Sequence, residues 1–337
     1  MLLRHRHSTN TTAPRASGFA AFSLLELLVS MAVLALLMLL ISRLLSSALT
    51  ATGMGNKHMD ADAQARAVLD RLGIDLGQMV RRPDVDYFLK DATHAPQPGN
   101  DQLAFFSEVP GYSASGFRST VSLVGYRVNS EGASPAHNRL QRMGSGLAWN
   151  GASASASEMP LVFSASPTSF APNAISTHWP AATTMAAADS YELAGPQIFR
   201  IEYFYVLKGT TAFNPVTATF ITLPAQLSDT PWDTRAPLNH TTVAGMRDVA
   251  AVTVMIAVMD PHSRVQVTDA QLNELIAAMP DFADTMQQGE LERRWQQAIT
   301  DAATASALPQ EAAASIRIYR RCFQLAPSTA GSALATP

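Results

Sequence analysis

One carboxylate stands alone in the most apolar part of this sequence, and it is the first candidate for chemistry. Glu26 lies at the start of a run in which residues 27–41 read LLVSMAVLALLMLLI, with Ser30 as the only polar residue. An ionised side chain inside a bilayer helix costs about 2.5–3.5 kcal/mol on insertion scales and is tolerated mainly when it is paired. The sequence therefore predicts a cationic partner for Glu26, unless its carboxylate reaches the lipid headgroups unpaired.

The other residues that could carry chemistry form no catalytic or metal-binding pattern. Cys322 is the single cysteine, and the eight histidines lack HExxH or His-x₃₋₅-His spacing, which excludes disulfide scaffolds and zinc modules. The segment from Gly111 to Ser115 lacks the final glycine of a GxSxG elbow. Asp84 and Asp86 lack the surrounding twelve-residue calcium-loop pattern. We therefore expect no enzyme activity, no cofactor and no metal.

Composition indicates a folded protein and excludes one class of partner. The chain has 337 residues, of which 47% are hydrophobic and 15% are charged, so it is too apolar to be disordered. Its net charge of −3 provides no overall positive field for holding DNA or RNA. We expect a folded core and no nucleic-acid partner.

Residues 22–45 predict one transmembrane helix. A helix of this length extends about 36 Å at roughly 1.5 Å per residue, which exceeds a hydrocarbon core of about 30 Å. The preceding residues 1–21 carry three arginines and no acidic residue. The positive-inside rule therefore keeps this leader in the cytoplasm and sends the C-terminal part of the chain across the membrane.

Three processing routes fit a basic leader followed by an apolar helix. Signal peptidase could cut after Ala48, where Ser46-Ser47-Ala48 offers a small-x-small site, and release a soluble secreted protein. An uncleaved helix would instead anchor a periplasmic hydrolase or ligand-binding domain. The third route is a cut before the helix, which then remains part of the mature protein.

The residues at the boundary favour the third route. Residues 18–30 read GFAAFSLLELLVS, and Glu26 is the fifth residue when Phe22 is counted as the first. This pattern resembles the N-terminal motif of type IV pilins and type II secretion pseudopilins. The resemblance implies that a prepilin peptidase cuts between Ala21 and Phe22, that Phe22 is then N-methylated, and that residues 1–21 are lost.

One position departs from the family motif. The family usually has glycine before the cut, where this chain has Ala21. A Gly-Phe pair does occur at Gly18-Phe19, but its fifth position is Ser23 rather than a carboxylate. The glutamate spacing therefore favours cleavage after Ala21.

The same resemblance gives Glu26 an assembly role. Cleavage would create an ammonium group on Phe22, which Glu26 of the same or a neighbouring subunit could neutralise, so that the pair fixes the axial stagger of packed helices. The implied partners are other pilin-like subunits of a hetero-oligomeric filament, the prepilin peptidase and N-methyltransferase, and membrane lipid. The implied location is the inner membrane, with a single span and a periplasmic C-terminal domain.

Beyond the span, the pattern predicts an α+β domain over residues 83–325. Residues 46–82 should continue the helix, with a flexible joint at Gly53 and Gly55 and with Leu72 and Leu76 on an apolar face that packs on a sheet. Asp75 is among the charged residues assigned to the solvated face. Five segments rich in β-branched or aromatic residues predict a half-exposed antiparallel sheet, at 102–106, 120–128, 197–207, 248–259 and 315–325.

Two late helices and two segments of a different kind complete the prediction. Helices are expected at 269–279 and 284–305. Residues 151–190 are rich in small residues and turn formers and are expected to form a long surface loop. Residues 326–337 are expected to form a disordered tail.

The soluble region carries a second, less specific resemblance. Residues 101–105 read DQLAF and residues 124–128 read VGYRV, which is similar to the Asp-x-Leu-x-Phe and Tyr-Arg-Val-like strands of J-type minor pseudopilins. Together with FFSEVPGY, these segments look closest to the pilin-like Verru_Chthon cassette protein C. The resemblance implies a pilin-like fold, and the size of the domain suggests a minor or tip subunit of a filament.

Overall fold

Helix α1, Leu24–Gly77, is the longest element of the protein. The computed structural model describes residues 23–81, 88–89, 99–112, 118–146, 191–214, 219–223, 225–229 and 249–325. The chain divides into two compact units, Met1–Met54 and Gly55–Pro337, and α1 contributes its N-terminal part to the first and its C-terminal part to the second. The backbone is helical through Gly53 and Gly55, where the two units meet along the chain.

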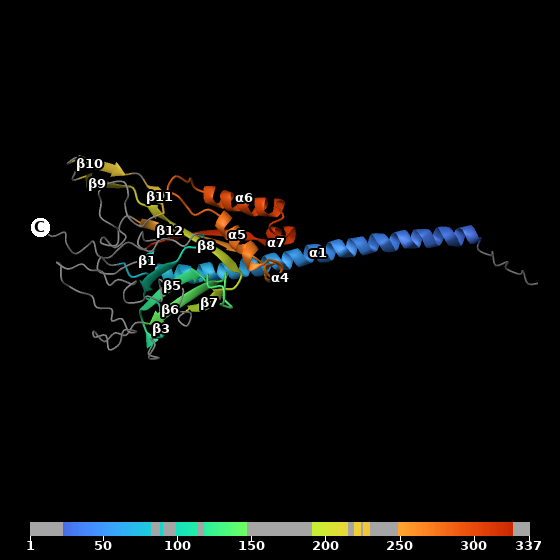
Figure 1. Cartoon of the computed structure of the whole chain (residues 1–337), viewed down its shortest axis with the longest axis horizontal. Coiled ribbons are helices and arrows are strands. Elements are labelled where there is room, and N and C mark those ends of the chain that lie inside the picture. The colour runs from blue at the N-terminus through green and yellow to red at the C-terminus, as the bar shows by residue number, and fades with distance from the viewer. Residues whose placement is uncertain are drawn as a thin grey trace, which may run out of the picture. The chain divides into compact units, whose positions relative to one another are not determined.

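In the described part of the second unit, two larger sheets, both mainly antiparallel, lie beside a two-stranded hairpin sheet (Figure 1). The first has the order β1-β2-β5-β6-β3-β4, with β7 also paired to β6. Its strands are Phe88–Leu89, Leu103–Ser107, Gly111–Tyr112, Arg118–Ser119, Ser122–Val128, Leu140–Gly146 and Tyr191–Gly195, numbered β1 to β7. The pairing of β3 with β6 is parallel, and the other pairings in this sheet are antiparallel.

The second sheet has four antiparallel strands in the order β11-β8-β12-β13. These strands are Gln226–Ser228 (β11), Ile198–Leu207 (β8), Val249–Val258 (β12) and Arg317–Gln324 (β13). A separate hairpin joins Thr210–Asn214 (β9) to Thr219–Leu223 (β10).

A first hydrophobic core joins α1 to both sheets. Leu69, Leu72 and Leu76 of α1 are almost fully buried and cluster with side chains of β2, β5, β8, β12 and β13. The predicted packing of this apolar face on a sheet is therefore confirmed. Burial of a leucine side chain contributes about 1.5–3 kcal/mol, so this face holds the C-terminal part of α1 firmly within its unit.

A second core lies on the other face of β8 and β12, under four helices (Figure 1). The helices are Pro261–Gln266 (α4), Asp269–Ala278 (α5), Glu290–Thr304 (α6) and Gln310–Ser315 (α7). Trp295 of α6 is fully buried there and donates its indole N–H to the carbonyl of Pro280 at 2.8 Å. Thr268 and Gln271 form a reciprocal capping box that starts α5. The protein is therefore an α+β protein, as predicted.

Three sequence predictions about these elements were wrong in detail. Helix α1 ends at Gly77 rather than at residue 82, because Met79 bridges Ser107 and Val80 donates to the carbonyl of Phe106 at 2.8 Å, so the backbone joins β2 instead. Helix α6 begins at Glu290 rather than at residue 284, because Gly289 adopts a left-handed conformation (φ 82°) that interrupts the helix.

The third correction concerns the sheet face. Strand β8 was predicted to have one partly wet face, yet nine of its ten residues are buried. Its two faces are covered by the two cores, since it is a central strand with α1 on one side and the late helices on the other. The predicted surface loop at 151–190 and the predicted tail at 326–337 lie outside the described residues.

Candidate functional site

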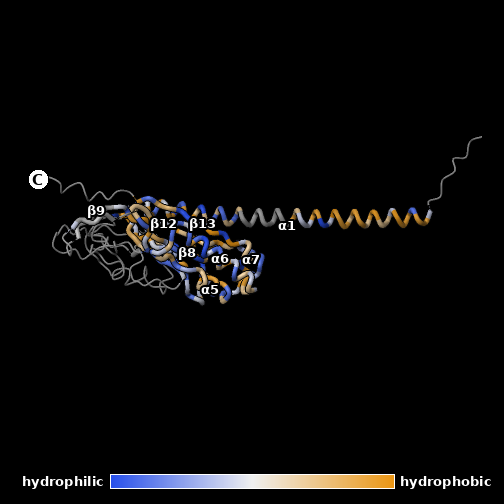
Figure 2. Tube along the Cα trace, turned by 90° about the horizontal axis from the view of Figure 1, so that it is seen from above, coloured by the Kyte–Doolittle hydropathy of each residue, from blue (hydrophilic) through white to orange (hydrophobic). Residues whose placement is uncertain are grey.

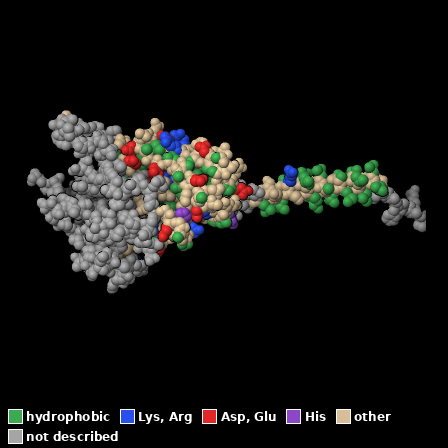
Figure 3. Space-filling model, in the orientation of Figure 1, with side chains coloured by type: hydrophobic (Ala, Val, Ile, Leu, Met, Phe, Trp, Pro, Cys, Tyr) green, Lys and Arg blue, Asp and Glu red, His purple; other side chains and the backbone are tan. Residues whose placement is uncertain are grey.

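The apolar part of α1 is the first candidate site. Leu24–Leu49 is the helix segment, among the described residues, that is long and apolar enough to cross a membrane by length and composition, and its side chains are exposed in the structure. Figure 2 shows the almost continuous hydrophobic colouring of this segment, and Figure 3 shows its hydrophobic side chains on the surface. An exposed apolar surface of this size is typical of contact with lipid or with other helices.

Glu26 lies in the first turn of this helix. Ser23 precedes the helix, and its Oγ accepts a hydrogen bond from the backbone N–H of Glu26 at 3.2 Å. Serine followed by glutamate three residues later is the capping-box pattern, and a carboxylate at a helix N-terminus is also favoured by the helix dipole. Glu26 is therefore suited to starting the helix as well as to pairing with a cation. The spacing of Ser23 and Glu26 is a sequence signal for this cap.

The second charge in the apolar segment is Arg43. Glu26 and Arg43 are separated by sixteen uncharged residues, which extend about 24 Å as a helix. Both side chains are exposed and long enough to reach the polar edge of a bilayer from these positions. The distribution of charge therefore fits a helix that crosses a membrane.

The predicted cleavage residues, Ala21 and Phe22, lie outside the described residues. Their proposed processing and the N-methylation of Phe22 therefore stay predictions. Asp84 and Asp86 also fall outside the described part of the chain. Within the described ranges, no cluster of three or more His, Cys, Asp or Glu side chains could hold a metal ion.

The C-terminal part of α1 is fixed in its unit by a buried carboxylate. Asp75 is fully buried, and its Oδ2 accepts hydrogen bonds from the hydroxyl of Tyr126 at 2.5 Å and from Nε of Arg142 at 2.7 Å. Its Oδ1 accepts a second bond from Arg142 at 3.0 Å and lies 3.3 Å from Nε of Arg71. We refer to Asp75, Arg71, Tyr126 and Arg142 as the Asp75 cluster.

The Asp75 cluster contradicts the prediction that Asp75 lies on a solvated face. Its partners Tyr126 and Arg142 come from β5 and β6, so the carboxylate ties the helix to two neighbouring strands. Burial, followed by the Asp75 carboxylate, raises the pKa of Tyr126 above its ordinary value, so the phenol remains a hydrogen-bond donor. The two parallel hydrogen bonds between Arg142 and Asp75 stabilise the pair and also fix the relative orientation of the two side chains.

Contacts between α1 and β13 reinforce this anchorage. Tyr319 donates to the carboxylate of Asp62, and Arg321 donates to that of Asp70. The Arg321–Asp70 pair is about half exposed, so its expected contribution is below about 1 kcal/mol. The buried Asp75 cluster is therefore the main polar connection between α1 and the sheets.

A second buried ion cluster holds the helical layer on β8. Arg200 is fully buried and donates to Glu202 at 3.2 Å, to Asp281 at 2.6 Å and to the carbonyl of Ile201 at 2.8 Å. Its guanidinium also lies 5.0 Å from the ring centre of Trp295. The sequence predicted a partly wet face for this strand, whereas the structure buries its charged residues Arg200 and Glu202 completely.

A stacked pair in the first sheet predicts a change of stability at alkaline pH. The guanidinium of Arg127 lies 3.8 Å from the ring centre of Tyr191. Burial raises the pKa of Tyr191 to about 12, although the nearby arginine acts in the opposite direction. Because the unfolded phenol titrates near pH 10, the folded state retains its proton more strongly between pH 10 and 12.

We therefore expect the stabilisation linked to Tyr191 to be fully present below about pH 10 and to be lost as pH rises to about 12, by about 3 kcal/mol. Denaturant titrations of the detergent-solubilised chain at pH 9 to 12 would measure this loss. Tyr191→Phe should lose less stability over the same interval, whereas parallel curves for the two proteins would contradict the assignment. Other tyrosines titrate in both proteins, so their effects cancel in the comparison.

No protein-family model and no curated protein matches this chain. Its function must therefore be inferred from its own residues and their geometry. Two features carry that inference: an exposed apolar helix that begins at a serine cap and a glutamate, and an α+β unit whose core includes the continuation of the same helix.

Proposed function

We propose that the protein is a minor subunit of a pilin-like filament rooted in the inner membrane. The observation that carries the proposal is the double use of α1. Its first part is apolar and uncovered between Leu24 and Leu49, and its last part is buried in the core of an α+β unit. One helix can thus supply both the contacts of assembly and the attachment of the domain.

The sequence supports the same proposal at the start of the helix. Phe22 is preceded by a basic leader, and a carboxylate is the fifth residue when Phe22 is counted as the first, which resembles the prepilin pattern apart from Ala21. In the proposed filament, Glu26 pairs with the ammonium of a cleaved Phe22, and helix packing in lipid supplies the remaining contact. The hydrogen bonds of the Asp75 cluster then keep the periplasmic domain attached to the helix that packs in the filament.

Two measurements of the membrane-bound chain test the processing step. Intact mass and N-terminal peptide analysis would be carried out in cells with and without a prepilin peptidase. We expect N-methyl-Phe22 in the first case and the uncut chain in the second. A mature terminus at Met1, or one after Ala48, would instead support a signal-anchored periplasmic hydrolase or ligand-binding protein, or a secreted one.

The charge of Glu26 can be separated from its capping function by substitution. Glu26→Gln removes the charge and keeps a residue that is compatible with a capping box. We expect it to reduce co-purification with pilin-like partners by about tenfold or more, since 1.4 kcal/mol of lost pairing corresponds to a factor of ten.

Ser23→Ala is the matched control, because it removes the cap hydrogen bond and leaves the carboxylate in place. We expect this variant to associate nearly normally once it is inserted in the membrane. If Glu26→Gln associates as well as the unmodified chain does, the charge pair is not part of assembly. If both variants fail equally, Glu26 acts through helix capping rather than through its charge.

A further inference from the structure

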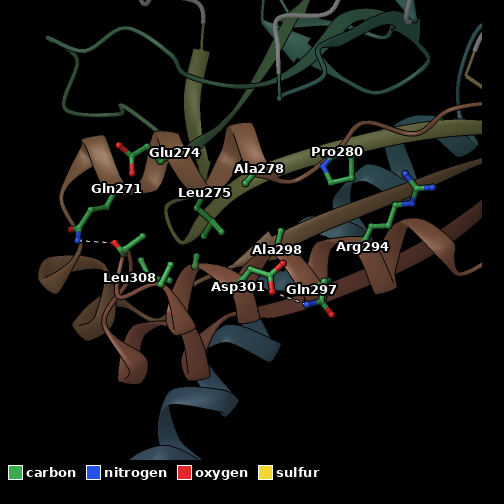
Figure 4. Close-up of a pocket in the computed structure, with 13 residues that line it drawn as sticks. Gln271, Glu274, Leu275, Ala278, Pro280, Arg294, Gln297, Ala298, Asp301 and Leu308 are labelled. Atoms are coloured by element: carbon green, nitrogen blue, oxygen red, sulfur yellow. Dashed lines mark hydrogen bonds between the residues drawn. The ribbon is translucent and has the colours of Figure 1, made fainter.

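A groove between α5 and α6 is not used by the proposed filament contacts. It has a volume of about 580 Å³, and its floor includes the apolar side chains of Leu275, Ala298, Ala302 and Leu308. Figure 4 shows Leu275 extending from α5 toward α6, with Ala298 and Leu308 on the other side of the gap. The alanines of α6 are too small to fill the space between the two helices, so the groove stays open.

The rim of the groove is polar, and its charge is negative. Gln271 donates to the carbonyl of Ala307 at 2.9 Å, and Gln297 donates to the Asp301 carboxylate at 2.7 Å (Figure 4). The rim carboxylates are Glu274 and Asp301.

The one rim arginine does not offset this charge. Arg294 is tied to Glu290 by hydrogen bonds of 2.6 and 3.0 Å, so its charge is already balanced within α6. The rim therefore presents a net negative charge beside an apolar floor.

The whole helical layer has the same sign. Residues 261–316 contain eight acidic residues and three arginines, a net charge of −5, whereas the complete chain carries −3. Such a field repels nucleic acid and anionic lipid headgroups and attracts positively charged segments. Charge and shape together select an occupant that is apolar on one side and basic on the other.

We propose that this groove binds a short, positively charged amphipathic segment of a partner protein. Apolar side chains of that segment occupy the floor near Leu275 and Ala302, and lysine or arginine side chains at its edge pair with Glu274 and Asp301. This is the arrangement by which an amphipathic helix enters a hydrophobic groove. The groove does not depend on the helix packing of a filament, so this assignment stands or fails separately from the proposed function.

Binding can be measured with designed peptides and the full chain. The chain is placed in phosphatidylcholine nanodiscs, and empty nanodiscs supply the baseline for fluorescence anisotropy. The probe is a labelled fourteen-residue peptide with leucines at helical spacing and lysines elsewhere. Two comparison peptides replace every lysine with glutamate, or every leucine with serine. We expect the Leu/Lys peptide to bind at least about tenfold more tightly than either comparison peptide.

Variants locate the binding on the groove. Glu274→Lys combined with Asp301→Lys should weaken binding of the Leu/Lys peptide about tenfold or more, and Ala302→Phe should do the same by filling the floor. Glu292→Lys combined with Glu311→Lys makes the same charge change on exposed helix positions outside the groove and should leave affinity within about threefold. Circular dichroism would verify that each variant is folded.

The proposal is overturned if the unmodified chain does not bind the Leu/Lys peptide, or if it binds the Leu/Glu or Ser/Lys peptide equally well. It is also overturned if the control pair weakens binding as much as the groove pair does, because the effect would then be one of overall charge. Ala302→Phe provides an independent check, since it alters the floor and leaves every charge unchanged.

Discussion

Replacing Asp75 with alanine is expected to lower the free energy of unfolding of the C-terminal unit by about 3–5 kcal/mol. The substitution removes the acceptor of three hydrogen bonds and leaves Arg142, whose side chain is 17% exposed, without its main counter-charge. It also leaves the hydroxyl of Tyr126 buried without its acceptor. Because folded domains are stable by only about 5–15 kcal/mol, a loss of this size removes a large share of the total.

Denaturant unfolding of the full chain in detergent, followed by near-ultraviolet circular dichroism, would measure the loss. That signal reports packing of aromatic side chains in the two sheets rather than the helicity of the apolar segment. Asp70→Asn is the matched control, since it removes a carboxylate from the same helix that pairs with exposed Arg321. The control should cost below about 1 kcal/mol. If both variants lose the same free energy of unfolding, the buried Asp75 contributes no more to stability than an exposed carboxylate of the same helix.

Replacing Arg200 with methionine is expected to destabilise the same unit by a similar amount, about 3–5 kcal/mol. The guanidinium donates hydrogen bonds to Glu202, to Asp281 and to a backbone carbonyl. It is also the main counter-charge of Glu202, whose side chain is fully buried. Its removal would leave the buried carboxylate of Glu202, on the same strand β8, without this counter-charge. The helical layer should therefore loosen first, which hydrogen exchange of α5 and α6 would detect.

A double substitution distinguishes lost charge pairing from lost packing. Arg200→Met with Glu202→Gln removes both charges and keeps an acceptor for the backbone N–H of Phe282, which bonds to Glu202 at 2.9 Å. This double variant should be more stable than Arg200→Met alone. Arg264→Ala, which breaks a partly exposed pair with Asp269, should cost below about 1 kcal/mol. A double variant no more stable than the single one would mean that the methionine itself disrupts the packing.

The regular elements of this fold could be predicted because their signals are local. The strands β5, β8 and β12 lie within two residues of their predicted bounds, and α5 begins at the predicted residue. Each is a run of β-branched and aromatic residues, or a periodic segment with a cap, that is legible within one window of sequence. The short elements α7 and β11 give no such signal and were not predicted. Helix α4 was also not predicted, although Asp260 followed by Pro261 is a local signal for the start of a helix.

The buried charges could not be predicted, because their partners are far away in sequence. Asp75 meets Tyr126 across 51 positions and Arg142 across 67, and Arg200 meets Asp281 across 81. Without that pairing, an aspartate beside apolar helix residues and an arginine in a strand both have the pattern of solvent-facing positions. The groove between α5 and α6 could not be predicted for a related reason. Its shape depends on the distance between two helices rather than on either helix alone.

The contacts of β13 have a consequence for how the domain is made. Tyr319 of this strand bonds to Asp62 across 257 positions, and Arg321 bonds to Asp70 across 251. The helix residues Asp62 and Asp70 are thus translated more than 250 positions before the strand residues that they contact. Contacts of such sequence separation slow folding, because a long loop must close before they can form. Leu69, Leu72 and Leu76 of the same helix are exposed in the nascent chain until the strands that cover them have been made, and a holding chaperone would protect them during that interval.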